Sequence, residues 1–134
     1  MHYTVDANFA DLRGKTLKSI EKIEKIRLLF HTDSGESFQM FHRDYCCETV
    51  EIEDICGDLD DLLHTPILVA EEVTGVQGKP LCETDESYTW TFYKLATIKG
   101  AVTIRWYGTS NGNYSEEVNF VEVKEEEMRD DNWL

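Results

Sequence analysis

The chain has 134 residues, of which 41% are hydrophobic, which is enough for one domain with a buried core. Its formal net charge of -14 disfavours direct binding to nucleic acid or to an anionic membrane. The sequence has neither a long apolar run nor a signal-like start, so we expect a cytoplasmic protein.

The first part of the chain predicts a short turn followed by strands. Residues 9–12 have the spacing of a helical turn that packs on the body. Residues 15–24 fit either a helix or a strand, and we favour a strand. Residues 25–32 and 37–42 alternate apolar and polar side chains around an Asp-Ser-Gly-Glu turn, which predicts a β-hairpin.

An amphipathic helix is predicted at about 51–64. Its apolar stripe, with helical spacing, consists of Ile52, Ile55, Cys56, Leu59, Leu62 and Leu63. Pro66 is expected to end the helix, because a proline disfavours helical geometry in the residue before it. Asp58, Asp60 and Asp61 fall in the interior and last turn, where aspartate weakens a helix, so we expect these three to serve another purpose.

The rest of the chain predicts strands. Residues 66–73 read as one strand, and residues 87–98, 102–107 and 114–123 alternate as three antiparallel strands of a meander.

The predicted fold class is therefore α+β. It is an antiparallel sheet of about six strands, with the single helix inserted after the third strand. Residues 1–123 are expected to form one domain, and residues 124–134 an acidic, partly disordered tail.

Two long stretches carry a resemblance to a known family. The stretch that contains CCETVEIEDICGDLDDL, within residues 45–73, and ESYTWTFYKLATIKGAVTIRWYGTSNGNYSE, residues 86–116, resemble an uncharacterised small-protein family that recurs in bacteriophage genomes. A weaker likeness lies at residues 14–24. The resemblance implies a phage or prophage protein that acts in the cytoplasm of a bacterial host cell, and it brings no catalytic residues.

The negative charge is concentrated in one segment. Residues 44–78 contain ten carboxylates and no lysine or arginine. Such a segment is either a solvated surface or a docking surface for a basic partner. The candidate partner-binding residues are Glu51, Glu53, Asp54, Asp58, Asp60 and Asp61.

A metal site is a weaker candidate, because the adjacent cysteines point to opposite faces of an extended backbone. Its ligands would come from His42, Cys46, Cys47 and Cys56. We expect all four cysteines of the chain to be reduced and structural. No arrangement typical of a catalytic site is present in the sequence, so we expect no enzymatic activity and no cofactor.

Aromatic residues cluster in the predicted meander. Tyr88, Trp90, Phe92, Trp106 and Tyr107 are expected to pack the core on one face of the sheet. The alternative is an exposed ledge for a ligand, formed by Tyr93, Arg105 and Tyr107.

Together these patterns predict a phage-type acidic interaction protein. It would bind and block a basic, nucleic-acid-binding surface of a host protein, such as a nuclease or an anti-phage defence complex of the CRISPR-Cas kind, by nucleic-acid mimicry. Two alternatives stay open. One is a small-ligand or metal-binding protein that uses the Cys/His region, and the other is a phage structural or assembly component.

Overall fold

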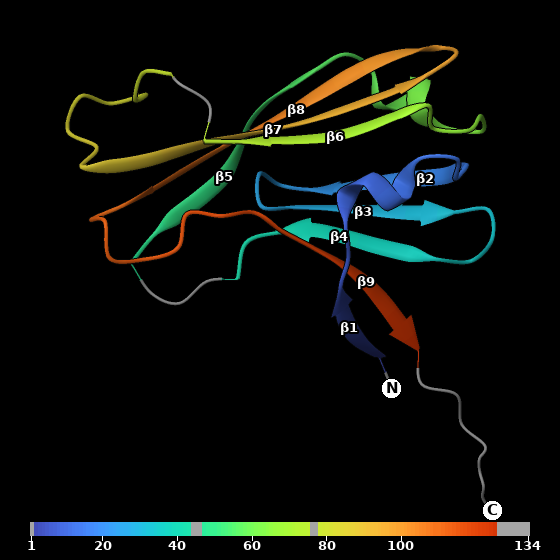
Figure 1. Ribbon diagram of the computed structural model, residues 1–134, viewed down its shortest axis with the longest axis horizontal. Coiled ribbons are helices and arrows are strands. Elements are labelled where there is room, and N and C mark those ends of the chain that lie inside the picture. Colours follow the sequence, from blue (N-terminus) through green and yellow to red (C-terminus); the bar gives the residue numbers. More distant parts are fainter. Residues whose placement is uncertain (1, 44–46, 76–77, 126–134) are drawn as a thin grey trace, which may run out of the picture.

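The computed structural model describes residues 2–43, 47–75 and 78–125. Within these residues, nine strands form two antiparallel sheets (Figure 1). The five-stranded sheet has the order β1 (His2–Asp6), β9 (Asn119–Glu125), β4 (Ser37–Phe41), β3 (Arg27–Thr32) and β2 (Leu17–Ile23). The four-stranded sheet has the order β5 (Thr49–Cys56), β8 (Gly100–Ser110), β7 (Ser87–Thr97) and β6 (Val69–Thr74). Two short 3₁₀ helices, η1 (Phe9–Leu12) and η2 (Leu59–Leu62), complete the described elements.

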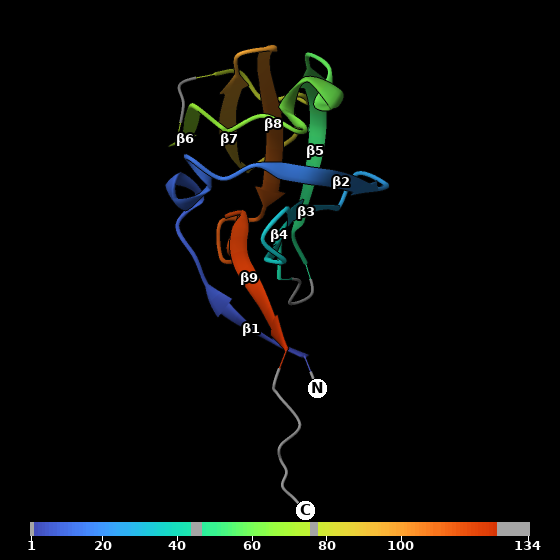
Figure 2. The ribbon, with the colours of Figure 1, turned by 90° about the vertical axis from the view of Figure 1, so that its right-hand side faces the viewer.

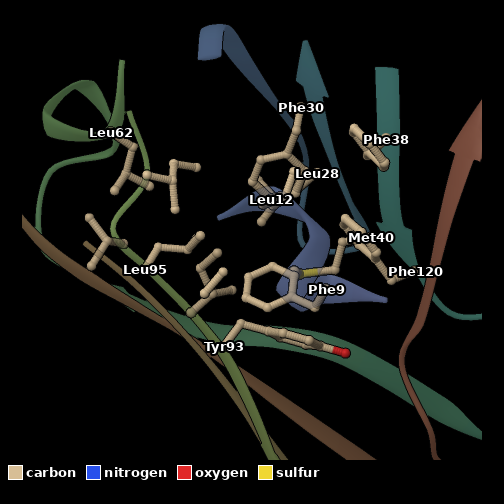
Figure 3. Packing of buried hydrophobic residues seen from close by; sticks show 14 of the residues in the cluster. Phe9, Leu12, Leu28, Phe30, Phe38, Met40, Leu62, Tyr93, Leu95 and Phe120 are labelled. Atoms are coloured by element: carbon tan, nitrogen blue, oxygen red, sulfur yellow. The ribbon is translucent and has the colours of Figure 1, made fainter. Parts of the chain in front are cut away.

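The core lies between the two sheets and is sealed by η1 and η2. Phe9 of η1 makes edge contacts with Tyr93, at 4.7 Å between ring centroids, and with Phe120, at 5.3 Å. Figure 3 shows this ring between residues of both sheets. Leu12 and Leu62 are also fully buried. Burying a side chain of this size contributes about 1.5–3 kcal/mol, so both short helices fasten the sheets together.

The predicted helix at 51–64 is wrong, and the α+β fold class with it: the described part of the chain is nearly all β. Val50 and Ile52 are buried while Glu51 and Glu53 are exposed, which is the alternation of a strand. An irregularity in the pairing with β8 between Ile52 and Asp54 then shifts the register. A β-bulge of this kind separates apolar residues by three positions, and this spacing imitates one turn of a helix.

Gly57 ends β5 and turns the chain. Its φ of +114° is a conformation that L side chains rarely adopt, and a Cβ at this position would lie 2.6 Å from the carbonyl oxygen of Ala101. The chain then enters η2. The rest of the predicted helix is therefore a sharp turn and a single 3₁₀ turn.

The predicted meander is also wrong in its third strand. β7 and β8 form a long hairpin, but β9 pairs with β4 and β1 in the other sheet. Both sides of β8 are already paired, with β5 and β7, so no hydrogen-bonding side remains for β9. In the five-stranded sheet, Phe120 of β9 stacks on Phe38 of β4 with ring centroids 5.5 Å apart.

Several local predictions are confirmed. The turn at residues 9–12 is η1, the strand within 15–24 is β2, and the predicted hairpin is β3–β4. Of the predicted tail, Lys124 and Glu125 belong to the end of β9, and residues 126–134 lie outside the described residues. Among the described residues, no helix has the length and apolar character needed to cross a membrane.

Candidate functional site

The six predicted partner-binding carboxylates lie along one edge of the four-stranded sheet. Glu51, Glu53 and Asp54 belong to β5, and Asp58, Asp60 and Asp61 belong to the turn that follows it; we call this set the acidic edge. β5 is an edge strand, since its one partner in the sheet is β8. All members are exposed except Asp61, which is half-buried. The structure therefore brings the predicted residues together, on a strand and a turn and not on a helix.

Within the described residues, one member of the acidic edge forms a side-chain ion pair. Glu53 Oε1 lies 3.3 Å from Nε of Arg105, although this nitrogen has no hydrogen-bond partner among the described residues. The Arg105 guanidinium also lies over the rings of Trp90 and Phe92, at 5.2 and 5.7 Å from their centroids. Exposed ion pairs of this kind contribute about 0–1 kcal/mol, so the pair partly neutralises Glu53 and by itself stabilises the fold little.

Two members have local structural roles. The Asp58 carboxylate accepts a hydrogen bond of 2.9 Å from the Asp60 backbone N–H and caps η2. Asp54 Oδ1 accepts one of 2.8 Å from the Ile55 N–H. Because Asp58 caps η2, the fold explains this aspartate, and its presence does not indicate partner binding.

The turn is also fastened to the β7–β8 hairpin. The Thr97 hydroxyl donates to the Asp61 carbonyl oxygen. A Cβ on Gly100 would lie 2.7 Å from Asp61 Oδ2, so a glycine lets this carboxylate approach the hairpin. By contrast, the Glu51 and Asp60 carboxylates have no hydrogen bond or ion pair within the described residues, which leaves both available to a partner.

A cavity of about 440 Å³ adjoins the acidic edge. Its lining comes from β5, from β8, from the segment before β7 and from the turn between β2 and β3: Lys25, Thr49, Glu51, Ile52, Glu53, Leu81, Asp85, Tyr107 and Thr109. The Tyr107 hydroxyl donates to Asp85 Oδ2 at 2.6 Å and accepts from the Leu81 N–H at 3.0 Å. Burial, together with the hydrogen bond to Asp85, raises the pKa of Tyr107 to about 12.

Sequence reasoning missed Lys25, Asp85 and Tyr107 as neighbours of the acidic edge. The backbone of Lys25 is held there because its carbonyl oxygen accepts a hydrogen bond of 2.7 Å from the Ile52 N–H. The three residues come from distant parts of the sequence, and no spacing in the chain signals that they meet.

The carboxylates of residues 44–78 do not all lie on the acidic edge. Glu71 and Glu72 belong to β6, which is the opposite edge strand of the same sheet (Figure 2). Charged side chains on edge strands hinder unwanted pairing between sheets, and this role is the structural alternative to partner binding.

The described members of the candidate metal-ligand set are not assembled into a site. His42 Nδ1 donates to the Glu117 carbonyl oxygen at 2.7 Å, and its Nε2 lies 2.8 Å from Glu48 Oε2, so both ring nitrogens are occupied. Cys47 is disulfide-bonded, so the expectation of a reduced thiol is wrong there, whereas Cys56 is free and exposed. Cys46 lies outside the described residues. No group of three possible metal ligands occurs among the residues that are described.

The aromatic residues of β7 and β8 are divided between two faces. Trp106 and Tyr93 are fully buried. The alternative prediction, an exposed ledge that includes Tyr93, is therefore wrong for this residue. Trp90 lies on the outer face of the sheet, so the prediction that it packs in the core between the sheets is wrong. Its indole N–H donates to the Lys79 carbonyl oxygen at 3.1 Å. The Tyr88 hydroxyl likewise donates to the Gly78 carbonyl oxygen at 2.7 Å. The outer aromatic face is therefore covered by the segment that precedes β7.

A protein-family model described as "Domain of unknown function (DUF7448)" matches residues 10–120. This match confirms that the chain resembles an uncharacterised family. No curated protein and no solved structure matches the chain.

Proposed function

The chain belongs to this family of unknown function, and we propose that it is an acidic binding protein that docks its acidic edge on a basic surface of another protein. The observation that carries the proposal is that Glu51 and Asp60, beside other exposed carboxylates on one strand and turn, have no side-chain partner in the part of the chain that the structure describes.

The physical basis is long-range attraction. Glu51 and Glu53 point to the same side of β5, and side chains two residues apart on a strand are separated by roughly 7 Å. A row of carboxylates on an exposed edge attracts lysine and arginine side chains, accelerates the encounter and fixes its orientation. The same attraction weakens with salt, because exposed charges are screened within about 10 Å at moderate ionic strength.

In this proposal the partner is a host protein that binds nucleic acid, such as a nuclease or an anti-phage defence complex, and the carboxylates occupy the place of phosphates. The phage origin and the cytoplasmic location are part of the proposal. They rest on the family resemblance read from the sequence at residues 45–73 and 86–116, and the choice of partner class is supported by the charge.

The experiment uses a triple variant in which Glu51→Gln, Asp54→Asn and Asp60→Asn are combined. Amides preserve the size of the side chains, and Asn at position 54 still accepts the Ile55 N–H. Asp58 and Asp61 are left intact, because the first caps η2 and the second packs against Gly100. Immobilised wild type and variant are used to capture proteins from a bacterial lysate, and capture is repeated with duplex DNA as competitor.

The matched control combines Asp11→Asn, Glu86→Gln and Glu125→Gln, which removes the same charge at exposed positions on other elements. We expect the wild type and this control to retain a basic protein that duplex DNA displaces, and the triple variant at the acidic edge to lose it. Equal retention by all three proteins would show that the carboxylates only solvate and protect the edge.

A further inference from the structure

The opposite edge of the four-stranded sheet has a different character. β6 pairs with β7 on one side, and no strand within residues 2–43, 47–75 and 78–125 pairs with its other side. Its neighbourhood exposes apolar side chains: Leu68 is 56% exposed, Val69 36% and Val73 38%. Edge strands that are exposed and apolar are templates for pairing with another strand, and proteins usually block them.

A cavity of about 430 Å³ runs beside this edge, between β6 and η1. Phe9, Ala10 and Arg13 form its wall on the η1 side, and residues 68–72 form the other wall. A neighbouring cavity, which shares Ala10, Arg13 and Leu68, continues it towards Gly14. β6 and η1 lie next to each other in both ribbon views (Figures 1 and 2). The edge is therefore accompanied by a hollow that can receive side chains.

These two features match the requirements of strand addition. An extended peptide that pairs with an edge gains main-chain hydrogen bonds, and its alternate side chains point to the two faces of the sheet. On one face they would enter the cavity beside Phe9. On the other they would cover Val69 and Val73, which share a face with Phe92 and Ala96 of β7.

Charge decides which strand fits. Glu71 and Glu72 lie in the middle of β6; Glu71 has no hydrogen bond or ion pair within the described residues, and Glu72 accepts a hydrogen bond of 3.0 Å from the Thr74 hydroxyl. If a second copy paired antiparallel with this edge, these carboxylates would face the same carboxylates of the copy, which is destabilising. A strand that carries lysine or arginine has the opposite charge.

We propose that the β6 edge binds an extended segment of another protein in which basic residues alternate with apolar ones. The inference is independent of the acidic edge, because β5 and β6 are the two outer strands of the sheet. It thus gives the chain a second, sequence-selective surface.

The test uses a capped, fluorescent peptide of alternating lysine and valine, and measures its affinity by anisotropy. The variant at the edge combines Glu71→Lys and Glu72→Lys. The control, Glu86→Lys with Glu125→Lys, makes the same change of net charge at exposed positions outside both β6 and the acidic edge; all four positions are exposed, and circular dichroism checks folding. We expect the β6 variant to bind roughly tenfold more weakly, and the control to lose far less.

Two N-methylated peptides test the main-chain pairing. Strand addition uses the amides on one side of the peptide only, so methylation of one alternate set should abolish binding and methylation of the other set should preserve it. NMR shifts of the bound state should map to residues 69–74. Equal losses in the two charge variants, equal binding of the two methylated peptides, absence of binding to the wild type, or a β6-mediated dimer would each overturn the proposal.

Discussion

Glu53 and Arg105 join the acidic edge to the aromatic outer face of the sheet. The two side chains are 3.3 Å apart, and the Arg105 guanidinium lies over Trp90 and Phe92. Of the six carboxylates on the edge, Glu53 is the one that has a side-chain ion pair within the described residues. The charge that faces solvent at Glu51 and Asp60 is therefore not cancelled by the fold.

We predict that Arg105→Gln lowers the free energy of unfolding by about 1.5–3 kcal/mol. The variant loses the contact with Glu53 and the cation–π contacts with the two rings, each worth about 0.5–1 kcal/mol where the site is exposed. Urea unfolding measures the change. Arg105→Lys is the informative comparison, because it keeps the charge but not the planar stacking group. If Arg105→Gln lowered the stability and Arg105→Lys had the stability of the wild type, the effect would come from the charge alone.

The buried contact between the sheets gives a second prediction. The Trp106 indole N–H donates to Met40 Sδ at 3.1 Å, across the interface of the two sheets. Met40→Leu nearly preserves volume but removes the acceptor, and it should destabilise by about 1 kcal/mol. Met40→Ala should cost about 2–5 kcal/mol, because it also leaves a cavity. Equal stability of the Leu variant and the wild type would show that the sulfur contributes by packing alone.

The His42–Glu48 pair should contribute more than the His31–Glu21 pair, which has the same chemistry. The imidazole and carboxylate are 2.8 Å apart in the first pair, with side chains 3% and 0% exposed, and 2.7 Å apart in the second, with 27% and 59% exposed. Breaking a buried pair costs about 3–5 kcal/mol, and an exposed pair contributes about 0–1 kcal/mol. We therefore expect Glu48→Gln to lower the unfolding midpoint clearly and Glu21→Gln hardly at all. If both variants lowered the unfolding midpoint by similar amounts, the larger contribution of the buried pair would be contradicted.

Tyr107 gives a prediction at alkaline pH. Its pKa is raised from 10.0 to about 12 by burial and by the hydrogen bond to Asp85. The unfolded chain ionises this tyrosine first, so the stability contribution is complete below pH 10 and is lost as the pH rises towards 12. Burial also raises the pKa of Tyr93, so the measurement compares Tyr107→Phe with the wild type, both with Tyr93 intact. The variant should show a smaller loss of stability over this range, and identical curves would contradict the prediction.

Local pairing was predictable from the sequence, but the partners of distant segments were not. The β3–β4 hairpin was readable because its alternation is regular and its turn contains Gly35. β5 was mistaken for a helix, since a bulge beside Asp54 breaks the alternation and imitates helical spacing. The placement of β9 depends on which strand of which sheet still has a free side, and this property belongs to the assembled fold.

The candidate site was likewise predictable in its local features but not in its contacts between distant segments. The sequence was sufficient to identify the exposed carboxylates as a group, because lysine and arginine are absent from the whole segment 44–78. It could not show that Asp58 caps a turn, that Arg105 reaches Glu53, or that Glu71 lies on the opposite edge. These relations depend on contacts between residues that are far apart in the chain.

The most direct measurement is the affinity of the captured partner for three proteins at low and high salt: the wild type, the amide triple variant at positions 51, 54 and 60, and the matched control at positions 11, 86 and 125. Docking through the acidic edge predicts that the first and third bind alike, and that the amide variant binds far more weakly with a much smaller salt dependence. An amide variant that binds as tightly as the control, with the same response to salt, would contradict the proposed function.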